Sequence, residues 1–204
     1  MDTSTAVEVS SPTFSSSSSS CSLDDVMYDV MYDVFLSFRG EDTRKTFTDL
    51  LYWRLKRAFV DVFIDENELR GGEIIPDKLN QIIQRSRISV IIFSRRYADS
   101  IWCLEALEKI MECRRTLGQI VLPIFYDVDP SDVREQTGSF AEAFQKHEER
   151  FHGVKDKEEK IQSWRKSLTE AAGLDGLALS TFDGYVGVFI KEINDEINRK
   201  LNRI

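Results

Sequence analysis

The residues best suited to chemistry lie in two short stretches, around Arg39 and around Trp102. In the first, Phe38-Arg39-Gly40 directly follows an apolar segment, and a guanidinium there can hold a phosphate through two parallel N–H donors. In the second, Trp102 and Cys103 open an amphipathic segment, and an indole offers a flat face on which a planar ring can stack. Both side chains could instead anchor the start of a helix in the core. We favour ligand binding for Trp102 and packing for Cys103.

Several common sites are absent from the sequence. Neither a G-x-x-x-x-G-K-[ST] phosphate loop nor a G-x-G-x-x-G dinucleotide motif occurs. The two histidines, His147 and His152, lie on or just past one helix without a cysteine or carboxylate motif, so we expect two solvated side chains and no metal site. A phosphate-accepting receiver domain needs an aspartate after its third strand, where Ser94 stands.

Charge and composition restrict the class of protein. The 204 residues have a net charge of −8 and a pI near 4.9, which disfavours nucleic acid as the main partner. No apolar run approaches the ~20 residues that cross a bilayer, and no basic start with an apolar run indicates a secretory signal. Three cysteines without paired spacing are typical of a reducing compartment. We therefore expect a cytoplasmic protein with no membrane partner, and the nucleus as a second location.

The organisation of the chain changes after residue 27. Residues 1–27 form a serine-rich leader that we expect to be disordered, because it has too little apolar surface to offset the entropy of ordering. Residues 28–204 read as one domain in which strand-like apolar runs alternate with helical patterns. This alternation predicts an α/β fold, a flavodoxin-like doubly wound five-stranded parallel sheet with helices on both faces.

The individual elements follow from the same patterns. The third and fourth strands lack polar alternation, which is typical of parallel strands covered on both faces. Ser139 and Glu142 have the spacing of a capping box at the start of a helix. The expected strands are Tyr32–Phe38, Val60–Ile64, Ile88–Phe93, Ile120–Phe125 and Gly176–Leu179, and the expected helices are 44–57, 77–85, 101–117, 139–150, 161–172 and 184–202.

Ligands of open parallel sheets bind beyond the carboxyl ends of the strands. Three polar loops are expected there, Ser37–Asp42, Asp65–Glu73 and Ser94–Trp102. A charged loop hinged by paired glycines is typical of a flexible lid or a self-association loop, and equally of a plain surface loop. The second loop has this composition, with Leu69, Arg70, Gly71, Gly72 and Glu73 at its centre.

A series of motifs covers residues 32–204. They are YDVFLSFRGEDTR (32–44), FTDLLY (47–52), FIDENELRGGEI (63–74), SRISVIIFSRRYADSIWCLEAL (86–107), LPIFYDVDPSDVREQTGSFAEAF (122–144) and WRKSLTEAA (164–172). In this order they resemble a plant TIR (Toll/interleukin-1 receptor) domain, as in intracellular immune receptors and TIR-only proteins.

The resemblance implies an activity, a site and partners. TIR domains of this kind self-associate and hydrolyse NAD+, which is their substrate and not a cofactor, and they trigger plant defence and cell death. The implied partners are further copies of the chain in dimers or tetramers, other TIR domains, and NAD+ or a related nucleotide. The implied pocket has Phe38, Arg39 and Gly40 on one wall and Ser100, Trp102 and Cys103 on the other.

The family usually places its catalytic glutamate where this chain has Ala106. The usual run is Trp-Cys-Leu-x-Glu-Leu, and here it is Trp102-Cys103-Leu104-Glu105-Ala106-Leu107. Because a helix turns by ~100° per residue, Ala106 is expected to face the core and Glu105 to face outward, so Glu105 cannot replace the missing carboxylate. Losing such a group typically costs ~10²–10⁴ in rate, so we expect a catalytically impaired chain. The intact motif favours an introduced alanine over a natural one.

Two functions are compatible with Ala106, and the resemblance adds two self-association surfaces. The first function is immune signalling by NAD+ hydrolysis, disabled here at Ala106. The second is a non-enzymatic adaptor or decoy that assembles with active partners.

The resemblance also implies association surfaces. Asp49 and Leu50 lie in a helix that contacts its copy in many relatives, which have a histidine in place of Leu50. Gly176 stands at a position that relatives use in a second interface.

Overall fold

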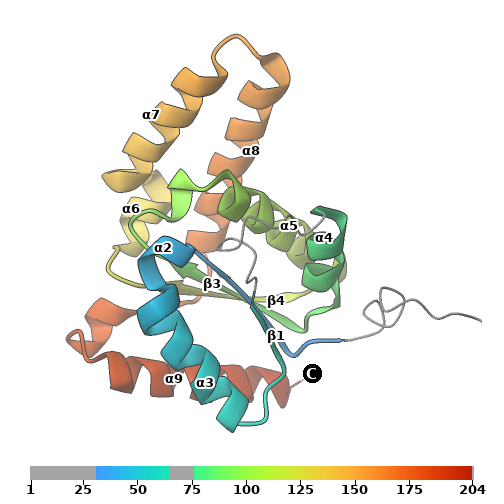
Figure 1. Cartoon of the computed structure of the whole chain (residues 1–204), viewed down its shortest axis with the longest axis vertical. Coiled ribbons are helices and arrows are strands. Elements are labelled where there is room, and N and C mark those ends of the chain that lie inside the picture. The colour runs from blue at the N-terminus through green and yellow to red at the C-terminus, as the bar shows by residue number, and fades with distance from the viewer. Residues whose placement is uncertain (1–30, 65–75, 204) are drawn as a thin grey trace, which may run out of the picture. The chain divides into compact units, whose positions relative to one another are not determined.

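The computed structural model describes residues 31–64 and 76–203. These form a five-stranded, wholly parallel sheet in the order β2-β1-β3-β4-β5, with helices on both faces (Figure 1). The α/β fold predicted from the sequence is confirmed. The predicted leader, 1–27, and the loop around 69–73 lie outside the described residues. The strands are β1 (Val34–Phe38), β2 (Val62–Ile64), β3 (Ile88–Phe93), β4 (Ile120–Phe125) and β5 (Leu177–Ala178).

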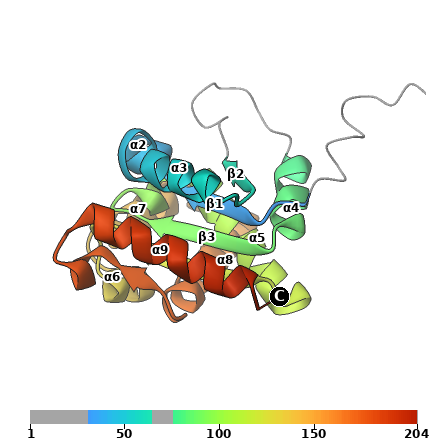
Figure 2. The same cartoon turned by 90° about the horizontal axis from the view of Figure 1, so that it is seen from below.

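Two hydrophobic clusters, one on each face of the sheet, make up the core. The first is contributed by α4 (Pro76–Arg85), α5 (Ile101–Leu117), α7 (Ser139–Phe151) and α8 (Lys155–Ala172). The second is contributed by α3 (Asp49–Arg57) and α9 (Val186–Leu201), which lie in front of the strands in Figure 2. Alternate residues of β1 and β3 point into opposite clusters, as a strand buried on both faces requires.

The predicted bounds of β3, β4 and α5 agree with the structure, whereas three strands are shorter than predicted. β1 begins at Val34 rather than Tyr32. Just before it, the Asp33 carboxylate accepts hydrogen bonds from Arg87 Nη1 and from the Asp61 backbone N–H, both at 3.0 Å. β2 begins at Val62 rather than Val60, whose N–H still donates to a carbonyl at the end of α3. β5 keeps only Leu177–Ala178 of the predicted 176–179.

The helix predicted over 44–57 begins earlier and is not uniform. A short helix, α2 (Gly40–Thr43), leads into a π-helical turn, η1 (Arg44–Thr48), and only then into α3. The Thr48 hydroxyl donates to the Thr43 hydroxyl at 2.8 Å inside this bend. The wider turn lets the chain leave β1 and redirect α3 along the sheet.

Three other helical predictions are corrected by the structure. The predicted capping box fails, because α7 starts at Ser139 itself and its N-cap is Gly138, with no side-chain cap. α8 begins at Lys155 instead of 161, and α9 runs Val186–Leu201 rather than 184–202. Three short helices were not predicted: η2 (Tyr97–Asp99), α6 (Pro130–Glu135) and η3 (Leu179–Phe182).

His147 is buried, so the prediction of two solvated histidines is wrong for this one. Its Nε2–H donates to the Ala98 carbonyl at 2.8 Å, and its ring meets Trp164 edge-on at 5.7 Å. The sequence prediction failed because α7 packs its inner face on η2 and α8. His152, just past α7, is exposed as expected.

Phe59 ends α3 in a left-handed conformation, with φ of 60°, and its side chain is 96% exposed. A side chain with a Cβ typically loses about 1 kcal/mol there, and an exposed ring recovers little of it. We expect Phe59→Gly to raise the free energy of unfolding by roughly 0.5–1 kcal/mol, measured by urea denaturation. Phe59→Ala is the control, since alanine keeps the strain. A lower denaturation midpoint for the glycine variant would contradict this explanation.

Candidate functional site

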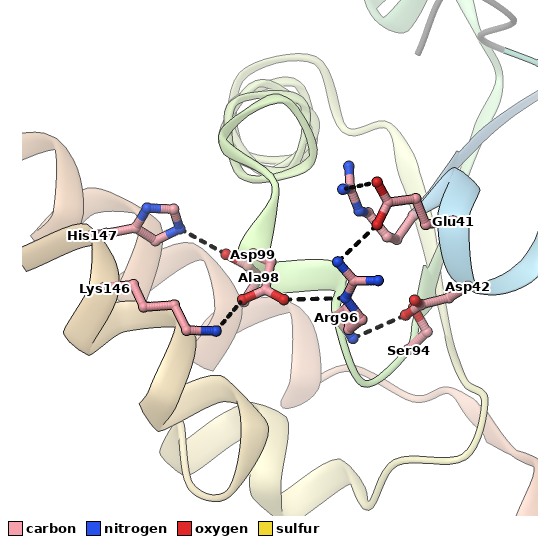
Figure 3. A network of polar contacts seen from close by, with 9 residues as sticks. Glu41, Asp42, Ser94, Arg96, Ala98, Asp99, Lys146 and His147 are labelled. Atoms are coloured by element: carbon pink, nitrogen blue, oxygen red, sulfur yellow. Dashed lines mark hydrogen bonds and ion pairs between the residues drawn. The ribbon is translucent and has the colours of Figure 1, made fainter. Parts of the chain in front are cut away.

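The loops that follow β1 and β3 are joined at the carboxyl edge of the sheet. Asp42 Oδ2 accepts hydrogen bonds from the Ser94 hydroxyl at 2.6 Å and from the Arg96 backbone N–H at 2.9 Å (Figure 3). β1 and β3 are adjacent strands, paired from Val34↔Ile88 onward, so their following loops are neighbours. One carboxylate on α2 therefore fixes the start of the β3 loop.

A row of alternating charges continues from this junction (Figure 3). Glu41 pairs with Arg39 at 3.0 Å and with Arg96 at 2.8 Å. Asp99 then pairs with Arg96 and with Lys146 on α7, each at 3.4 Å. The row holds the Arg39 loop and η2 against each other, and it places the Arg39 guanidinium at this edge of the sheet.

The turn η2 lies immediately before α5 in the chain. Ser100 is the N-cap of α5, and its hydroxyl accepts the Cys103 N–H at 3.2 Å. Capping by serine fixes where a helix begins, and α5 therefore begins at Ile101. Trp102, Cys103 and Ala106 consequently lie within its first two turns.

The first turns of α5 and the end of β1 enclose a narrow inner hollow of about 20 Å³. Cys103 Sγ donates to the Phe38 carbonyl at 3.4 Å and ties the two walls together. Four of the predicted site residues thus meet here. The hollow is lined by Phe35, Leu36, Ser37, Phe38, Leu79, Trp102, Cys103 and Ala106.

An outer groove of about 550 Å³ opens on the other side of Ala106, between α4, α5 and α8. It shares Leu79, Trp102 and Ala106 with the inner hollow, so position 106 lies where the two spaces meet. Its volume is in the range of small-molecule sites, about 300–1,000 Å³. Its other lining residues are mostly charged: Asn80, Glu105, Glu108, Lys109, Glu112, Arg115 and Lys160.

Ala106 faces inward, and the neighbouring carboxylate does not. Ala106 is only 6% exposed, whereas Glu105 is exposed on the outer side of α5. The outward direction expected for Glu105 from helical rotation agrees with this burial. Cys103 is buried, and the partly buried Trp102 packs at the edge of the core.

The remaining predicted site residues lie elsewhere. Arg39 follows Phe38 as the N-cap of α2, Gly40 is the first residue of α2, and Ser100 caps α5. Asp49 and Leu50 lie on α3, across the sheet from α5, where both are exposed. Gly176 packs directly against β4, just before β5.

Asp42 and Tyr97 are site residues that sequence reasoning did not name. The sequence placed their loops at the same edge, but hydrogen bonds between loops depend on rotamers that no motif specifies. A usable signal was the pair of polar groups, Asp42 and Ser94, just after adjacent parallel strands.

Residues 31–64 and 76–203 contain no group of three or more His, Cys, Asp or Glu side chains placed to hold a metal ion. Within the same ranges, no helix is long and apolar enough to cross a membrane.

α3 and α9 form an exposed surface on the opposite face of the sheet. Leu50 is 56% exposed on α3, and Trp53 and Val188 are exposed nearby on the two helices. Beside them the Lys191–Asp195 hydrogen bond and ion pair, 2.6 Å long, raises the pKa of Lys191 and lowers that of Asp195. The surface thus combines apolar side chains with fixed charges, as many protein interfaces do.

Comparisons with known proteins find a matching family and similar relatives. Residues 31–204 match the family model of the TIR domain. The chain is 51% identical over 184 residues to disease resistance protein RPV1 of Vitis rotundifolia, covering 90% of the chain and 13% of that protein. It is 48% identical over 171 residues to TMV resistance protein N of Nicotiana glutinosa, covering 84% and 15%. The chain therefore spans less than a sixth of the length of either relative.

A solved structure shows the same fold at high similarity. The TIR domains of the activated Roq1 resistosome, which directly recognises the pathogen effector XopQ, superpose with a TM-score of 0.74 at 44% identity. The match covers 81% of the present chain and 99% of the Roq1 chain. Sequence and structure comparisons therefore agree over the same part of the molecule.

Proposed function

The chain belongs to the TIR domain family, and on this premise we propose that it is a plant immune-signalling domain that self-associates and binds NAD+ for hydrolysis, with its turnover impaired by Ala106. The observation that supports this most strongly is the place of position 106. It faces inward beside Trp102, where the inner hollow and the outer groove meet.

The proposed reaction cleaves the bond between nicotinamide and ribose. NAD+ and water give nicotinamide, ADP-ribose and one proton. Positive charge builds on the ribose as the bond breaks, and a carboxylate at position 106 would stabilise it. Alanine supplies neither charge nor a hydrogen-bond acceptor. The chain should therefore bind the nucleotide and cleave it poorly.

The other groups of the site suit the parts of this substrate. Trp102 offers an aromatic face at the border of the groove, where a nicotinamide ring can stack. The Arg39 guanidinium pairs with Glu41 at 3.0 Å. It can bind a phosphate in place of this carboxylate or together with it. Trp102 borders position 106, and Arg39 directly follows Phe38, which lines the inner hollow.

Relatives support the signalling part of the proposal. RPV1 and N are named as resistance proteins, and the Roq1 TIR domains belong to an assembly that recognises a pathogen effector. We propose by analogy that this chain acts in defence signalling and cell death, in the cytoplasm and also in the nucleus. Its proposed partners are other TIR domains and further copies of itself.

We propose the exposed α3 surface around Asp49 and Leu50 for self-association. Leu50→Arg should weaken dimerisation at least about tenfold, because a buried charge without a partner opposes association. Sedimentation velocity over a range of concentrations measures this. Leu117→Arg is the matched control, since Leu117 is 60% exposed at the far end of α5. Equal dimerisation of both variants would place the interface elsewhere.

A second candidate is a non-enzymatic adaptor or decoy that assembles with active TIR domains. Ala106 itself favours this candidate, because the assembly surface and the fold do not depend on a carboxylate there. The two candidates differ in one outcome. Restoring the carboxylate should create turnover in the first and leave the second inactive.

Product analysis of the Ala106→Glu variant tests the proposed function. Purified variant at a concentration where it self-associates is incubated with NAD+, and the products are separated by chromatography. Equal amounts of nicotinamide and ADP-ribose are expected. Absence of nicotinamide while self-association persists would favour the adaptor function instead.

A further inference from the structure

The Tyr97 hydroxyl links the two walls of the inner hollow. Its oxygen lies 2.8 Å from the Ser37 hydroxyl on β1, and it donates to the Cys103 carbonyl on α5 at 3.2 Å. Tyr97 and Ser37 are both buried. A single hydroxyl therefore connects the end of the central strand with the first turn of the helix that holds Trp102 and Ala106.

Packing alone accounts for the Tyr97 ring but not for its hydroxyl. The ring meets Phe93 edge-on at 5.0 Å within the core, and a phenylalanine would make the same contact. Burying a hydroxyl costs free energy unless it is hydrogen-bonded. Here it is bonded on both sides, to groups on two elements that border the inner hollow.

The position of Cys103 explains why this link matters for the site. Cys103 follows Trp102 directly and precedes Ala106 by less than one helical turn. A hydrogen bond to the Cys103 carbonyl therefore fixes the position and the rotation of the first turn of α5 relative to β1. Cys103 Sγ is also bonded to the Phe38 carbonyl at 3.4 Å. A small shift of this turn would move both the indole and position 106 relative to β1.

The opposite end of the same segment is held by another link. Asp42 fixes Ser94 and Arg96, as Figure 3 shows, and the Tyr97 N–H donates to the Ser94 carbonyl at 3.1 Å. The segment from Ser94 to Ser100 is thus fastened at its outer end by a carboxylate and at its inner end by the Tyr97 hydroxyl. The Tyr97 hydroxyl contacts α5 through the Cys103 carbonyl, in addition to the Ser100 cap.

We propose that Tyr97 is a positioning residue of the nucleotide site, whose hydroxyl sets the placement of Trp102 and residue 106 against β1. This inference rests on the proposed function for its kinetic consequence. Its structural consequence, the placement of Trp102, holds independently of turnover. Tyr97 itself touches no substrate in this arrangement.

The kinetic test compares Tyr97→Phe with its parent, both carrying Ala106→Glu. Misplacing reacting groups by about 1 Å can cost on the order of 10² in rate, and the loss of one link should move α5 less than that. We expect kcat for NAD+ to fall about tenfold while KM changes less than about threefold. Tyr126→Phe is the matched control, because Tyr126 packs on Phe47 in the core cluster of the opposite face.

The structural test uses the chain with Ala106 in place and needs no turnover. The indole N–H signal of Trp102, assigned with Trp102→Phe, is followed by ¹⁵N NMR. Tyr97→Phe and Ser37→Ala should both shift this signal, the first more than the second, while Tyr126→Phe leaves it unchanged. Ser37→Ala removes one partner of the same link and serves if Tyr97→Phe does not fold.

The outcomes separate the two proposals. If Ala106→Glu does not cleave NAD+, the proposed function fails, and the Trp102 signal alone decides the role of Tyr97. An unmoved Trp102 signal in Tyr97→Phe or Ser37→Ala would overturn the positioning role. If the Ala106→Glu parent is active, an equal kcat in its Tyr97→Phe variant would also overturn the positioning role. A hydrogen bond that only stabilises the fold would change the unfolding midpoint but neither kcat nor the Trp102 signal.

Discussion

Ala106→Glu is expected to raise the rate of NAD+ cleavage by about 10²–10⁴. The gain follows from where the side chain would lie. Position 106 is only 6% exposed and borders both the inner hollow and the outer groove, so a carboxylate there would lie beside the ribose in partly desolvated surroundings. Electrostatic stabilisation of developing charge is strongest in such surroundings. The measurement is nicotinamide release per protein at saturating NAD+.

Two further variants define what the glutamate supplies. Ala106→Gln has the same length without the charge and should stay near the rate of the parent chain. Glu105→Ala in the Ala106→Glu background should keep most of the restored rate, because Glu105 is exposed and lines the outer groove but not the inner hollow. Equal activity of the Gln and Glu variants would contradict a role for charge at position 106.

Gly176→Ala is expected to lower the free energy of unfolding by roughly 3 kcal/mol, the upper end of the usual cost of overpacking. A Cβ at Gly176 would lie 2.5 Å from the Pro123 carbonyl oxygen and 2.7 Å from Pro123 Cγ. The oxygen belongs to the backbone of β4, which lies between β3 and β5, so it cannot move aside without disturbing the pairing with these strands. Urea denaturation at low protein concentration measures the change.

Gly187→Ala is the matched control for this prediction. Its added Cβ meets nothing within 4 Å, and Gly187 lies in α9, where alanine favours the helix by up to about 1 kcal/mol. It should therefore be neutral or stabilising. Comparable stability of the two variants would contradict the close packing of Gly176 on β4. The packing on β4 alone already requires a glycine at position 176. A loss of self-association in Gly176→Ala therefore supports an interface role only if the stability of the variant is measured as well.

The core of the fold could be predicted because its strands and one helix have unambiguous patterns. The runs Ile88–Phe93 and Ile120–Phe125 are apolar except for Ser89, and both strands are covered on both faces. α5 agrees at both ends because Ser100 caps it and Gly118, with φ of 69°, ends it. In each case the local signal and the tertiary environment favour the same bounds.

Other boundaries depend on contacts that no local pattern contains. Just before β1, the Asp33 carboxylate bonds Asp61 and Arg87, which lie 28 and 54 residues further along the chain. The π-helical turn before α3 reflects how the chain leaves the sheet, and the burial of His147 reflects the packing of α7 on η2. The predicted capping box failed because Ser139 lies one residue inside the helix.

The candidate site was predictable in its parts and not in its connections. The sequence indicated the β1 loop, the start of α5 and the inward direction of residue 106. It did not indicate that Asp42 and Tyr97 hold these parts together, because the relevant hydrogen bonds join segments more than fifty residues apart in the chain.

An NAD+ titration of the chain with Ala106 in place tests the nucleotide site most directly, because bound NAD+ should remain uncleaved. The three tryptophans report on three places: Trp102 at the site, Trp53 exposed on α3, and Trp164 buried on α8. Saturable movement of the Trp102 indole N–H signal is expected, with Trp53 and Trp164 unmoved. No movement of Trp102 at NAD+ concentrations up to about 1 mM, the upper end of usual KM values, or movement of Trp53 alone, would contradict a nucleotide site at the start of α5.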